Sequence, residues 1–323
     1  MSENPFVSVV VPAKNSESII TECLESIKSS SYRNFELLVV DGHSTDKTRD
    51  IAKSLGANVI PGINKGLTAD YNVGFKSASG EIVVFTDADC VVDKHWLERI
   101  VKCFNDLQVG IAGGPDRTYL RNANAIERAA GHVHAFYRLL ATKEGADAVI
   151  GCNCAYRRSC LIEVGGFDES LPGCVDTEIN SRILEKGYKV TVDPMCIVYH
   201  KRKNSLVRVI RDYWTYGVDM GIVHHKSPRR LKERIKHIYP LIAGLLIFLL
   251  LIGLSFKFSV LIWIVGALLL FYFIFQLLIQ RWLTIKTGFK SNFFVFLLVS
   301  TLSMVSYSAG FIKWQFLPHK GYK

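Results

Sequence analysis

Apolar and polar positions follow two different periods from the N-terminus to about residue 200. Three short segments are almost entirely apolar, at Val7–Val11, Phe35–Val40 and Ile82–Phe85. Between the first two, apolar residues recur every three or four positions over Ile19–Ile27, which is the period of a helix packed on one side. Strands that are apolar at every position lie in parallel sheets with helices on both faces. The pattern therefore predicts an α/β domain.

Other segments extend this pattern. Short strands are expected at Val59-Ile60, Val190–Val192 and Ile197–Tyr199, and helices at Ala69–Ala78 and Lys94–Leu107. Neither a G-x-G-x-x-G sequence nor a P-loop follows the first apolar segment. The residues therefore favour neither a dinucleotide-binding fold nor a P-loop NTPase.

The last third of the chain has a different pattern. Three apolar runs without acidic or basic residues lie at Ile238–Phe256, Phe258–Ile279 and Phe293–Ile312. Each has about 20 residues, the length at which a helix crosses a bilayer. A buried core helix is the alternative, but three such runs in succession favour three membrane spans.

Basic residues are densest just before the first apolar run, in a chain with a formal net charge of +10. A nucleic acid could attract this cluster, but its position beside a predicted span favours anionic membrane lipids and the positive-inside rule. Arg281, Lys286 and Lys290, between the second and third runs, are expected on the same side. No nucleic-acid partner is expected.

The segment before the first span predicts an amphipathic helix. Apolar residues from Leu206 to Gly217 share one face, which suits the membrane interface, although a helix of a soluble domain is the alternative. Met1–Pro5 lacks the charge and hydropathy of a signal peptide, so the α/β domain is expected in the cytosol of a multi-pass protein of the cell membrane. Eight cysteines without C-x2-C spacing agree with reduced structural thiols.

Polar side chains stand where three predicted strands end. Asn15 follows the first strand, Asp41 the second, and Asp87-Ala88-Asp89 the strand Ile82–Phe85. Ligands of open α/β sheets bind beyond the carboxyl ends of the strands, so these residues are candidates for one site. Two carboxylates there suit Mg²⁺ or Mn²⁺ shared with substrate phosphates. The alternatives are a solvated turn at Asp87–Asp89 and helix capping after Asp41.

Two later residues are weaker candidates. Asp176 opens a predicted helix, where a carboxylate could deprotonate an acceptor hydroxyl or simply stabilise the helix dipole. His200 follows the strand Ile197–Tyr199, and from the residues alone it is more often a packed or surface histidine than a ligand.

Taken in order, these segments resemble glycosyltransferase family 2. The resemblance runs between Pro5 and His200 through VSVVVPAKN, VVDGHSTDKT, NKGLTADYNVG, GEIVVFTDADC, GGFDE, VDTEINSRILEKGY and VYH. An ordered set is far more specific than any one member. The resemblance implies an inverting enzyme with the GT-A fold, a Rossmann-like mixed α/β sheet, followed here by C-terminal transmembrane helices.

The resemblance also implies a role for each matching residue. Nucleotide-sugar binding is implied for Pro12, Ala13, Asn15, Asp41, Lys65, Asp87 and Ala88. A Mg²⁺ or Mn²⁺ ion bridging the diphosphate is implied at Asp89 and Asp87, with His200 able to approach it. Asp176 matches the first acid of the family's D-x-[DE] element and would be the catalytic base.

The chain departs from the family pattern at three places. The frequent Asp-Asp pair is Asp41-Gly42, which keeps the first acid. The usual Ala-Arg-Asn is Asp70-Tyr71-Asn72, so one basic contact to the diphosphate is missing, for which Lys65 could substitute. The Gln-x-x-Arg-Trp of processive polysaccharide synthases is absent, which argues against a channel of the cellulose or hyaluronan type.

Together these features predict a metal-dependent, inverting hexosyltransferase. It would move a sugar from a UDP- or GDP-linked donor to a membrane-associated acceptor, a polyprenyl-linked saccharide, in glycan or polysaccharide assembly. Residues 1–203 would be the catalytic domain, 204–237 basic interfacial helices and 238–323 the spans. One alternative is a glycosyltransferase that loads polyprenyl phosphate itself. The other is a non-catalytic GT-A membrane subunit, which the presence of the acids disfavours.

Overall fold

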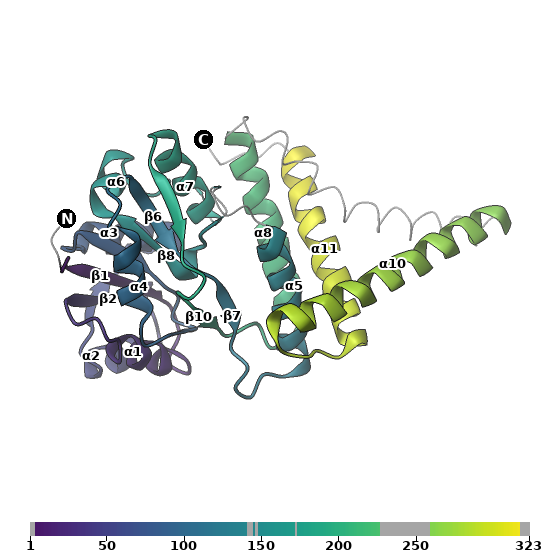
Figure 1. The fold of residues 1–323 in the computed structure, drawn as a ribbon, viewed down its shortest axis with the longest axis horizontal. Helices are drawn as coiled ribbons and strands as arrows, with labels where there is room; N and C mark the ends of the chain where they lie inside the picture. Colours follow the sequence, from purple (N-terminus) through teal and green to yellow (C-terminus); the bar gives the residue numbers. More distant parts are fainter. Residues whose placement is uncertain (1–3, 141–144, 146–147, 172, 227–258, 317–323) are drawn as a thin grey trace. The chain divides into compact units, whose positions relative to one another are not determined.

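The computed structural model describes residues 4–140, 145, 148–171, 173–226 and 259–316 (Figure 1). The chain divides into two compact units. The first comprises Met1–Tyr119 and Ala141–Lys201, and the second comprises Leu120–Leu140 and Arg202–Lys323.

The first unit is built on a mixed seven-stranded sheet with the order β3-β2-β1-β4-β8-β6-β9. Its strands are β1 (Val7–Ala13), β2 (Phe35–Asp41), β3 (Asn58–Pro61), β4 (Ile82–Phe85), β6 (Val109–Gly113), β8 (Cys154–Arg157) and β9 (Lys189–Val192). Neighbours from β3 to β4 are parallel, whereas β8 is antiparallel to both β4 and β6. The apolar runs predicted for β1, β2 and β4 are confirmed as buried strands.

Helices cover both faces of this sheet, which explains why its central strands are apolar at every position. One face packs against α1 (Ile20–Lys28), α2 (Thr48–Ser54) and α4 (Trp96–Cys103). The other packs against α3 (Leu67–Ser77) and α7 (Val175–Glu185), with α6 (Arg158–Glu163) following β8. A Cβ atom on Gly74 in α3 would overlap the side chain of Val10 in β1, so glycine permits this close approach.

A small second sheet lies at the edge where β4 ends. It has the order β5-β10-β7, from β5 (Cys90–Val92), β10 (Val198–His200) and β7 (Asp116–Thr118). The residues of Val149–Ala155 predict a strand with polar insertions, but the structure has a short 3-10 helix there, η1 (Gly151–Asn153), before β8. Asn153 explains the difference, because its buried side chain bonds Trp96 Nε1 and the carbonyl oxygens of Pro115 and Cys196.

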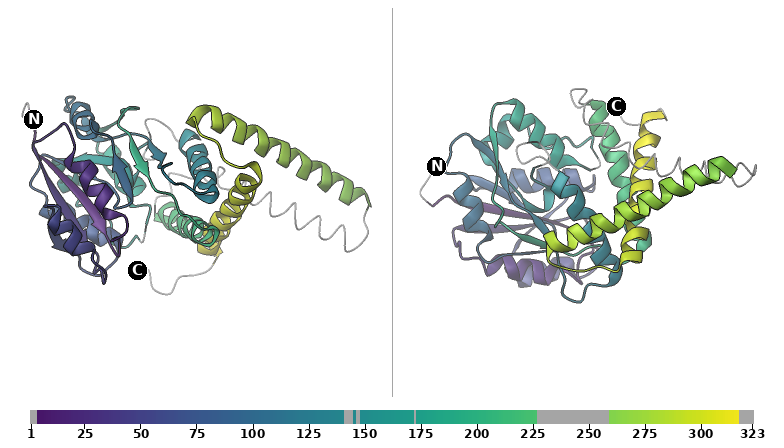
Figure 2. Two further views of the ribbon diagram at one scale, coloured as in Figure 1. Left: turned by 90° about the horizontal axis from the view of Figure 1, so that it is seen from below. Right: turned by 45° about the vertical axis from the view of Figure 1, so that its right-hand side comes forward.

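The described part of the second unit consists of helices. They are α5 (Ala125–Leu140), α8 (Leu206–Lys226), α10 (Ser259–Thr287) and α11 (Phe293–Phe316). Helices α8 and α11 lie side by side, whereas α10 extends away from them (Figures 1 and 2). A Cβ atom on Gly217 would overlap the Tyr307 carbonyl oxygen, so small residues set this close helix contact.

Two described helices are long and apolar enough to cross a membrane, over Val265–Thr287 and Phe293–Phe311. They correspond to the second and third predicted spans, and the first, Ile238–Phe256, lies outside the described residues. Helix α10 continues to Thr287, so Arg281 and Lys286 lie in the helix and not in the loop expected there. Part of the apolar face predicted from Leu206 to Gly217 packs against other helices of this unit.

Candidate active site

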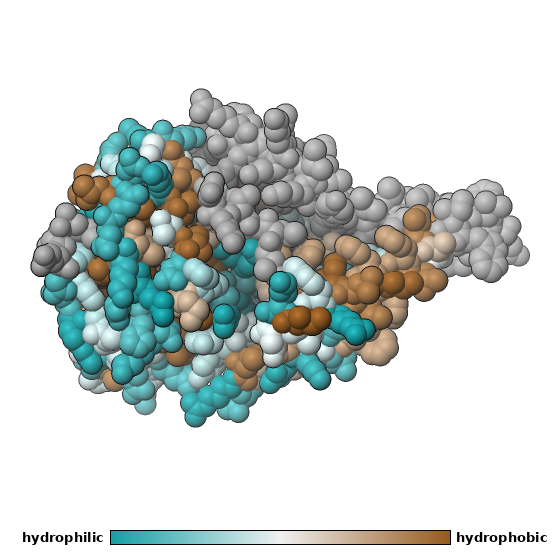
Figure 3. All heavy atoms as spheres, viewed as in Figure 1, coloured by the Kyte–Doolittle hydropathy of each residue, from teal (hydrophilic) through white to brown (hydrophobic). Residues whose placement is uncertain are grey.

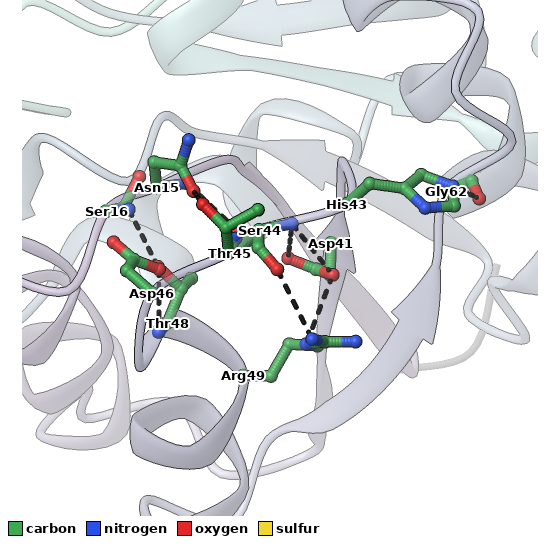
Figure 4. Close-up of polar contacts among 10 residues, drawn as sticks. All are labelled: Asn15, Ser16, Asp41, His43, Ser44, Thr45, Asp46, Thr48, Arg49 and Gly62. Carbon is green, nitrogen blue, oxygen red and sulfur yellow. Dashed lines mark hydrogen bonds and ion pairs between the residues drawn. The ribbon is translucent and has the colours of Figure 1, made fainter.

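The ends of β1 and β2 are tied together by Asn15 (Figure 4). Its backbone N–H donates to Ser44 Oγ (3.0 Å), and its Oδ1 accepts from Thr45 N–H (2.9 Å). Asn15 has a φ of 50°, in the left-handed region that asparagine tolerates better than most residues. Asn15 therefore holds two loops together at the sheet edge. This structural role is additional to the nucleotide-binding role predicted for it.

Asp41 is the last residue of β2 and is only 3% exposed. Its carboxylate accepts a hydrogen bond from Ser44 N–H (3.1 Å) and lies 3.6 Å from Arg49 Nε. Pro12 and Ala13 end the neighbouring strand β1 and are also buried. The structure thus brings Pro12, Ala13, Asn15 and Asp41 together at adjacent strand ends.

The first turn of α3 adds an acid to this region. Asp70 is 7% exposed, and a Cβ atom on Gly42 would lie 3.0 Å from its Oδ2. Burial raises the pKa of the Asp70 carboxyl, while His43 and Lys14 act in the opposite direction. Lys65 is exposed in the loop before α3. Sequence reasoning treated Asp70 only as a departure from a motif, because its burial depends on the packing of α3.

Asp87 and Asp89 follow β4 and are held by backbone contacts to their neighbours. The Asp87 carbonyl accepts from Cys90 N–H (3.0 Å), and the Asp89 carbonyl accepts from Lys201 N–H (3.0 Å). Ala88 between them is buried. Pairing of β10 with β5 places His200 opposite Cys90, and His200 Nε2 lies 3.0 Å from Asp89 Oδ1. A carboxylate at this distance orients the imidazole, as it does in many metal sites.

Four side chains at this edge have the geometry of a metal site. Ligand atoms of Asp87, Asp89, Cys90 and His200 all lie within 4.8 Å of one another. Carboxylate oxygens suit Mg²⁺ and Mn²⁺, and imidazole suits transition metals, so the residues fit Mn²⁺ well and Mg²⁺ through the carboxylates. The residues alone favour an ordinary packed or surface histidine at His200, whereas this geometry favours a metal ligand.

Asp176 lies in the first turn of α7 with both carboxylate oxygens fixed by backbone N–H groups. Oδ2 accepts from Gly151 N–H (2.8 Å), and Oδ1 accepts from Thr177 N–H (2.8 Å). The residue before α7 is unusual, because Cys174 adopts a left-handed conformation with a φ of 51°. Asp176 is therefore held to η1 as well as to its own helix.

Tyr71 connects the region of Asp87 with that of Asp176. It is 3% exposed and packs against Phe85, with ring centroids 4.8 Å apart. Its hydroxyl lies near Gly151, because a Cβ atom there would be 3.1 Å from Tyr71 Oη and 3.8 Å from Asp176 Oδ2. Burial raises the pKa of Tyr71 well above its usual value, and the charges of Asp87 and Asp176 raise it further. Tyr71 is thus an O–H donor at neutral pH.

The chain is similar in sequence to known glycosyltransferases. Residues 8–165 match the model of Glycosyl transferase family 2. A glycosyltransferase from Haloferax volcanii, AglE, is 30% identical over 58% of this chain and 64% of its own length. A Methanococcus voltae dolichyl N-acetyl-alpha-D-glucosaminyl phosphate 3-beta-D-2,3-diacetamido-2,3-dideoxy-beta-D-glucuronosyltransferase is 23% identical over 69% of this chain and 75% of its own. In the first three relatives, the match spans only 33% to 64% of their lengths.

The fold is also that of a solved glycosyltransferase. The mannosyltransferase PcManGT from Pyrobaculum calidifontis, solved in complex with GDP-Man and Mn²⁺, superposes with a TM-score of 0.68. The superposition covers 98% of this chain and 88% of that chain, at 21% sequence identity. The GT-A type of mixed α/β sheet expected from sequence is therefore confirmed.

Proposed function

We propose that this chain, which belongs to glycosyltransferase family 2, transfers a sugar from a nucleotide-diphosphate donor to a lipid-linked saccharide. The observation that carries the proposal is the set of carboxylates along one sheet edge, from Asp41 through Asp87 and Asp89 to Asp176. In this assignment Asp41, Asn15, Pro12 and Ala13 border the nucleotide, and Lys65 and Ala88 lie along the diphosphate.

The remaining roles are ion binding and proton transfer. Asp87, Asp89 and His200 would hold a divalent ion, Mn²⁺ or Mg²⁺, which when bound offsets the charge developing on the diphosphate leaving group. Asp176 is assigned as the general base because it matches the first acid of the family's D-x-[DE] element, and two backbone N–H groups hold its carboxylate in place. Attack on C1 from the face opposite the leaving group would invert the anomeric centre.

The apolar helices give the proposed acceptor a physical reason. In the most apolar 18 residues of the stretch Val265–Thr287, only 17% of the residues are buried among the described ones. Helix α10 is therefore unlike the core helix of a soluble protein, which is mostly buried. We assign α10 and α11 to the membrane, with the first unit on the cytosolic side. The relatives that act on dolichyl-phosphate-linked or O-antigen acceptors favour a saccharide on a lipid carrier.

The test is transfer of label from a panel of radiolabelled UDP-, GDP- and dTDP-sugars into the lipid extract of membranes that contain the protein. We expect one donor to label a lipid-linked saccharide, and EDTA to abolish the labelling until Mn²⁺ or Mg²⁺ is restored. Asp89→Asn should lose this metal-dependent labelling, whereas Asp106→Asn, an exposed loop acid, should keep it.

The products distinguish the alternatives. Label on a lipid that carries a single sugar on one phosphate would instead identify polyprenyl phosphate as the acceptor. No label from any donor, with the protein folded, would contradict an enzymatic role and favour a non-catalytic membrane subunit. Retention of configuration in the product would contradict the inverting mechanism.

A further inference from the structure

Two thiols lie beside the proposed ion site and have no role in the mechanism above. Ligand atoms of Cys90, Cys152 and His200 all lie within 4.8 Å of one another, as a second group that shares Cys90 and His200 with the first. Both cysteines are almost fully buried, at 0% and 5% exposed. Thiols are soft donors, whereas the carboxylates of Asp87 and Asp89 are hard ones. The same small region therefore offers two chemically different sets of ligands.

The backbone fixes these thiols in place. Cys90 opens β5 and lies opposite His200 in the pairing of β5 with β10. Cys152 lies in η1, and its carbonyl accepts from the buried Thr86 hydroxyl (2.9 Å). The next residue, Asn153, is anchored by its buried side chain to Trp96, Pro115 and Cys196. The cluster is thus built on strands and an anchored turn.

The thiols also lie close to one another and to the imidazole. The Sγ atom of Cys152 lies within 4.8 Å of Cys90 Sγ and of a ring nitrogen of His200. Asp89 Oδ1 lies beside this group, 3.0 Å from His200 Nε2 and 3.9 Å from Cys90 Sγ. Two sulfurs and one nitrogen match a Zn²⁺ site with three protein ligands, whose fourth tetrahedral position is left to water.

We propose that Cys90, Cys152 and His200 form a site for Zn²⁺ or a similar borderline-soft divalent cation, and that it excludes the ion needed for transfer. Exclusion follows because His200 cannot serve both ions at once. Each cysteine ligand gives up its proton on binding, so one Zn²⁺ displaces two protons and the buried thiolates are balanced by the dication. The site would make the enzyme sensitive to zinc.

The first test needs no enzymatic activity and uses the full chain in detergent with a non-thiol reductant. Co²⁺ replaces Zn²⁺ as a probe, because thiolate-bound Co²⁺ has a charge-transfer absorption that carboxylate-bound Co²⁺ lacks. We expect one Co²⁺ per chain with this absorption, lost on addition of one equivalent of Zn²⁺. Cys152→Ser should lose the absorption, whereas Cys103→Ser, a half-buried cysteine outside the cluster, should keep it. Equal spectra for the two variants would overturn the proposal.

The second test rests on the proposed function and measures Mn²⁺-supported sugar transfer against added Zn²⁺. We expect Zn²⁺ to inhibit the wild type and Cys103→Ser alike, and Cys152→Ser to need at least about tenfold more Zn²⁺, because losing even a residue that only supports a metal ligand costs about 10- to 100-fold in affinity. Cys152→Ala replaces the serine variant if that does not fold. Equal inhibition of all variants would contradict the exclusion, whereas a thiolate spectrum in a protein without transferase activity would contradict only the proposed function.

Discussion

The two units of this chain differ in how much of their large apolar side chains they leave exposed. In the first, the fully buried residues are large and apolar, such as Trp96, Phe85 and Phe104. In the second, α10 and α11 bury the polar Gln276, Ser300 and Ser303 along with a few apolar residues such as Leu283 and Phe296, while many large apolar side chains of α10 are exposed (Figure 3). The exposed ones include Leu270, Phe271, Leu278 and Ile285.

The contrast shows that the two units follow different rules of packing. In water, burial of apolar area stabilises the first unit. If lipid surrounds α10 and α11, as we propose, exposed leucine costs nothing, and close contact through small residues and hydrogen bonds holds the helices together. A substitution in the first unit's site should therefore lower turnover without loss of stability. A substitution at the contact between α8 and α11 should lower stability instead.

Asp176→Asn gives the largest expected effect and separates turnover from stability. General bases contribute about 10²- to 10⁴-fold to rate, so we expect a loss of that size in kcat, with nucleotide-sugar binding kept. Glu178→Gln is the matched control in the same helical turn, because Glu178 pairs with Arg182 (2.6 Å). The control should keep kcat and lower the melting temperature slightly. Full turnover in Asp176→Asn would make our assignment of the base wrong.

Gly217→Ala tests the second unit with the same logic. The added methyl group overlaps the backbone of α11, so we expect a cost of about 3 kcal/mol, seen as a lower melting temperature in detergent. Gly266→Ala in α10 is the control, because a Cβ atom there meets nothing within 4 Å. Alanine favours helix by about 1 kcal/mol over glycine, so the control should be neutral or stabilising. Equal melting temperatures for the two variants would contradict the close contact.

Acidification should weaken the second unit through His132. The His132 ring is buried, forms a hydrogen bond between its Nδ1 and Ser291 Oγ (2.7 Å), and stacks on Phe289. Burial lowers the pKa of His132 to about 4. An unfolded histidine titrates near 6.5, so the unfolded state binds more protons, and stability is lost as pH falls from about 6.5 toward 4, by up to about 3 kcal/mol. Melting temperatures of detergent-solubilised protein between pH 7.5 and 4.5 measure this loss.

The control for this pH dependence is His132→Gln, which has no titrating group at that position. Its melting temperature should fall less steeply with acid than that of the wild type. Parallel slopes for the two proteins would show that other groups set the acid sensitivity.

The strands on the parallel side were predictable because burial on both faces leaves a continuous apolar run, as in Ile82–Phe85. Helix α5 was not predicted, because its buried positions include the small residues Ala129 and Ala130 among basic ones. Acids at strand ends could be found for the same topological reason as the strands. The grouping of Cys90 with Cys152, and of Tyr71 with Asp176, depends on tertiary packing that no local pattern encodes.

Tyr71→Phe gives the smallest expected effect. It tests whether this buried tyrosine of the first unit takes part in turnover or only in packing. Phenylalanine keeps the ring contacts with Phe85 and removes only the hydroxyl near Asp176 and Asp87. A hydrogen bond to a charged partner contributes about 1.5 to 3 kcal/mol, so if the hydroxyl contacts the substrate, kcat/KM should fall at least about tenfold. Tyr156→Phe is the control, because Tyr156 Oη bonds the buried Asn180 (2.9 Å) and should affect melting temperature and not turnover. The same pattern in both variants would assign Tyr71 to packing alone.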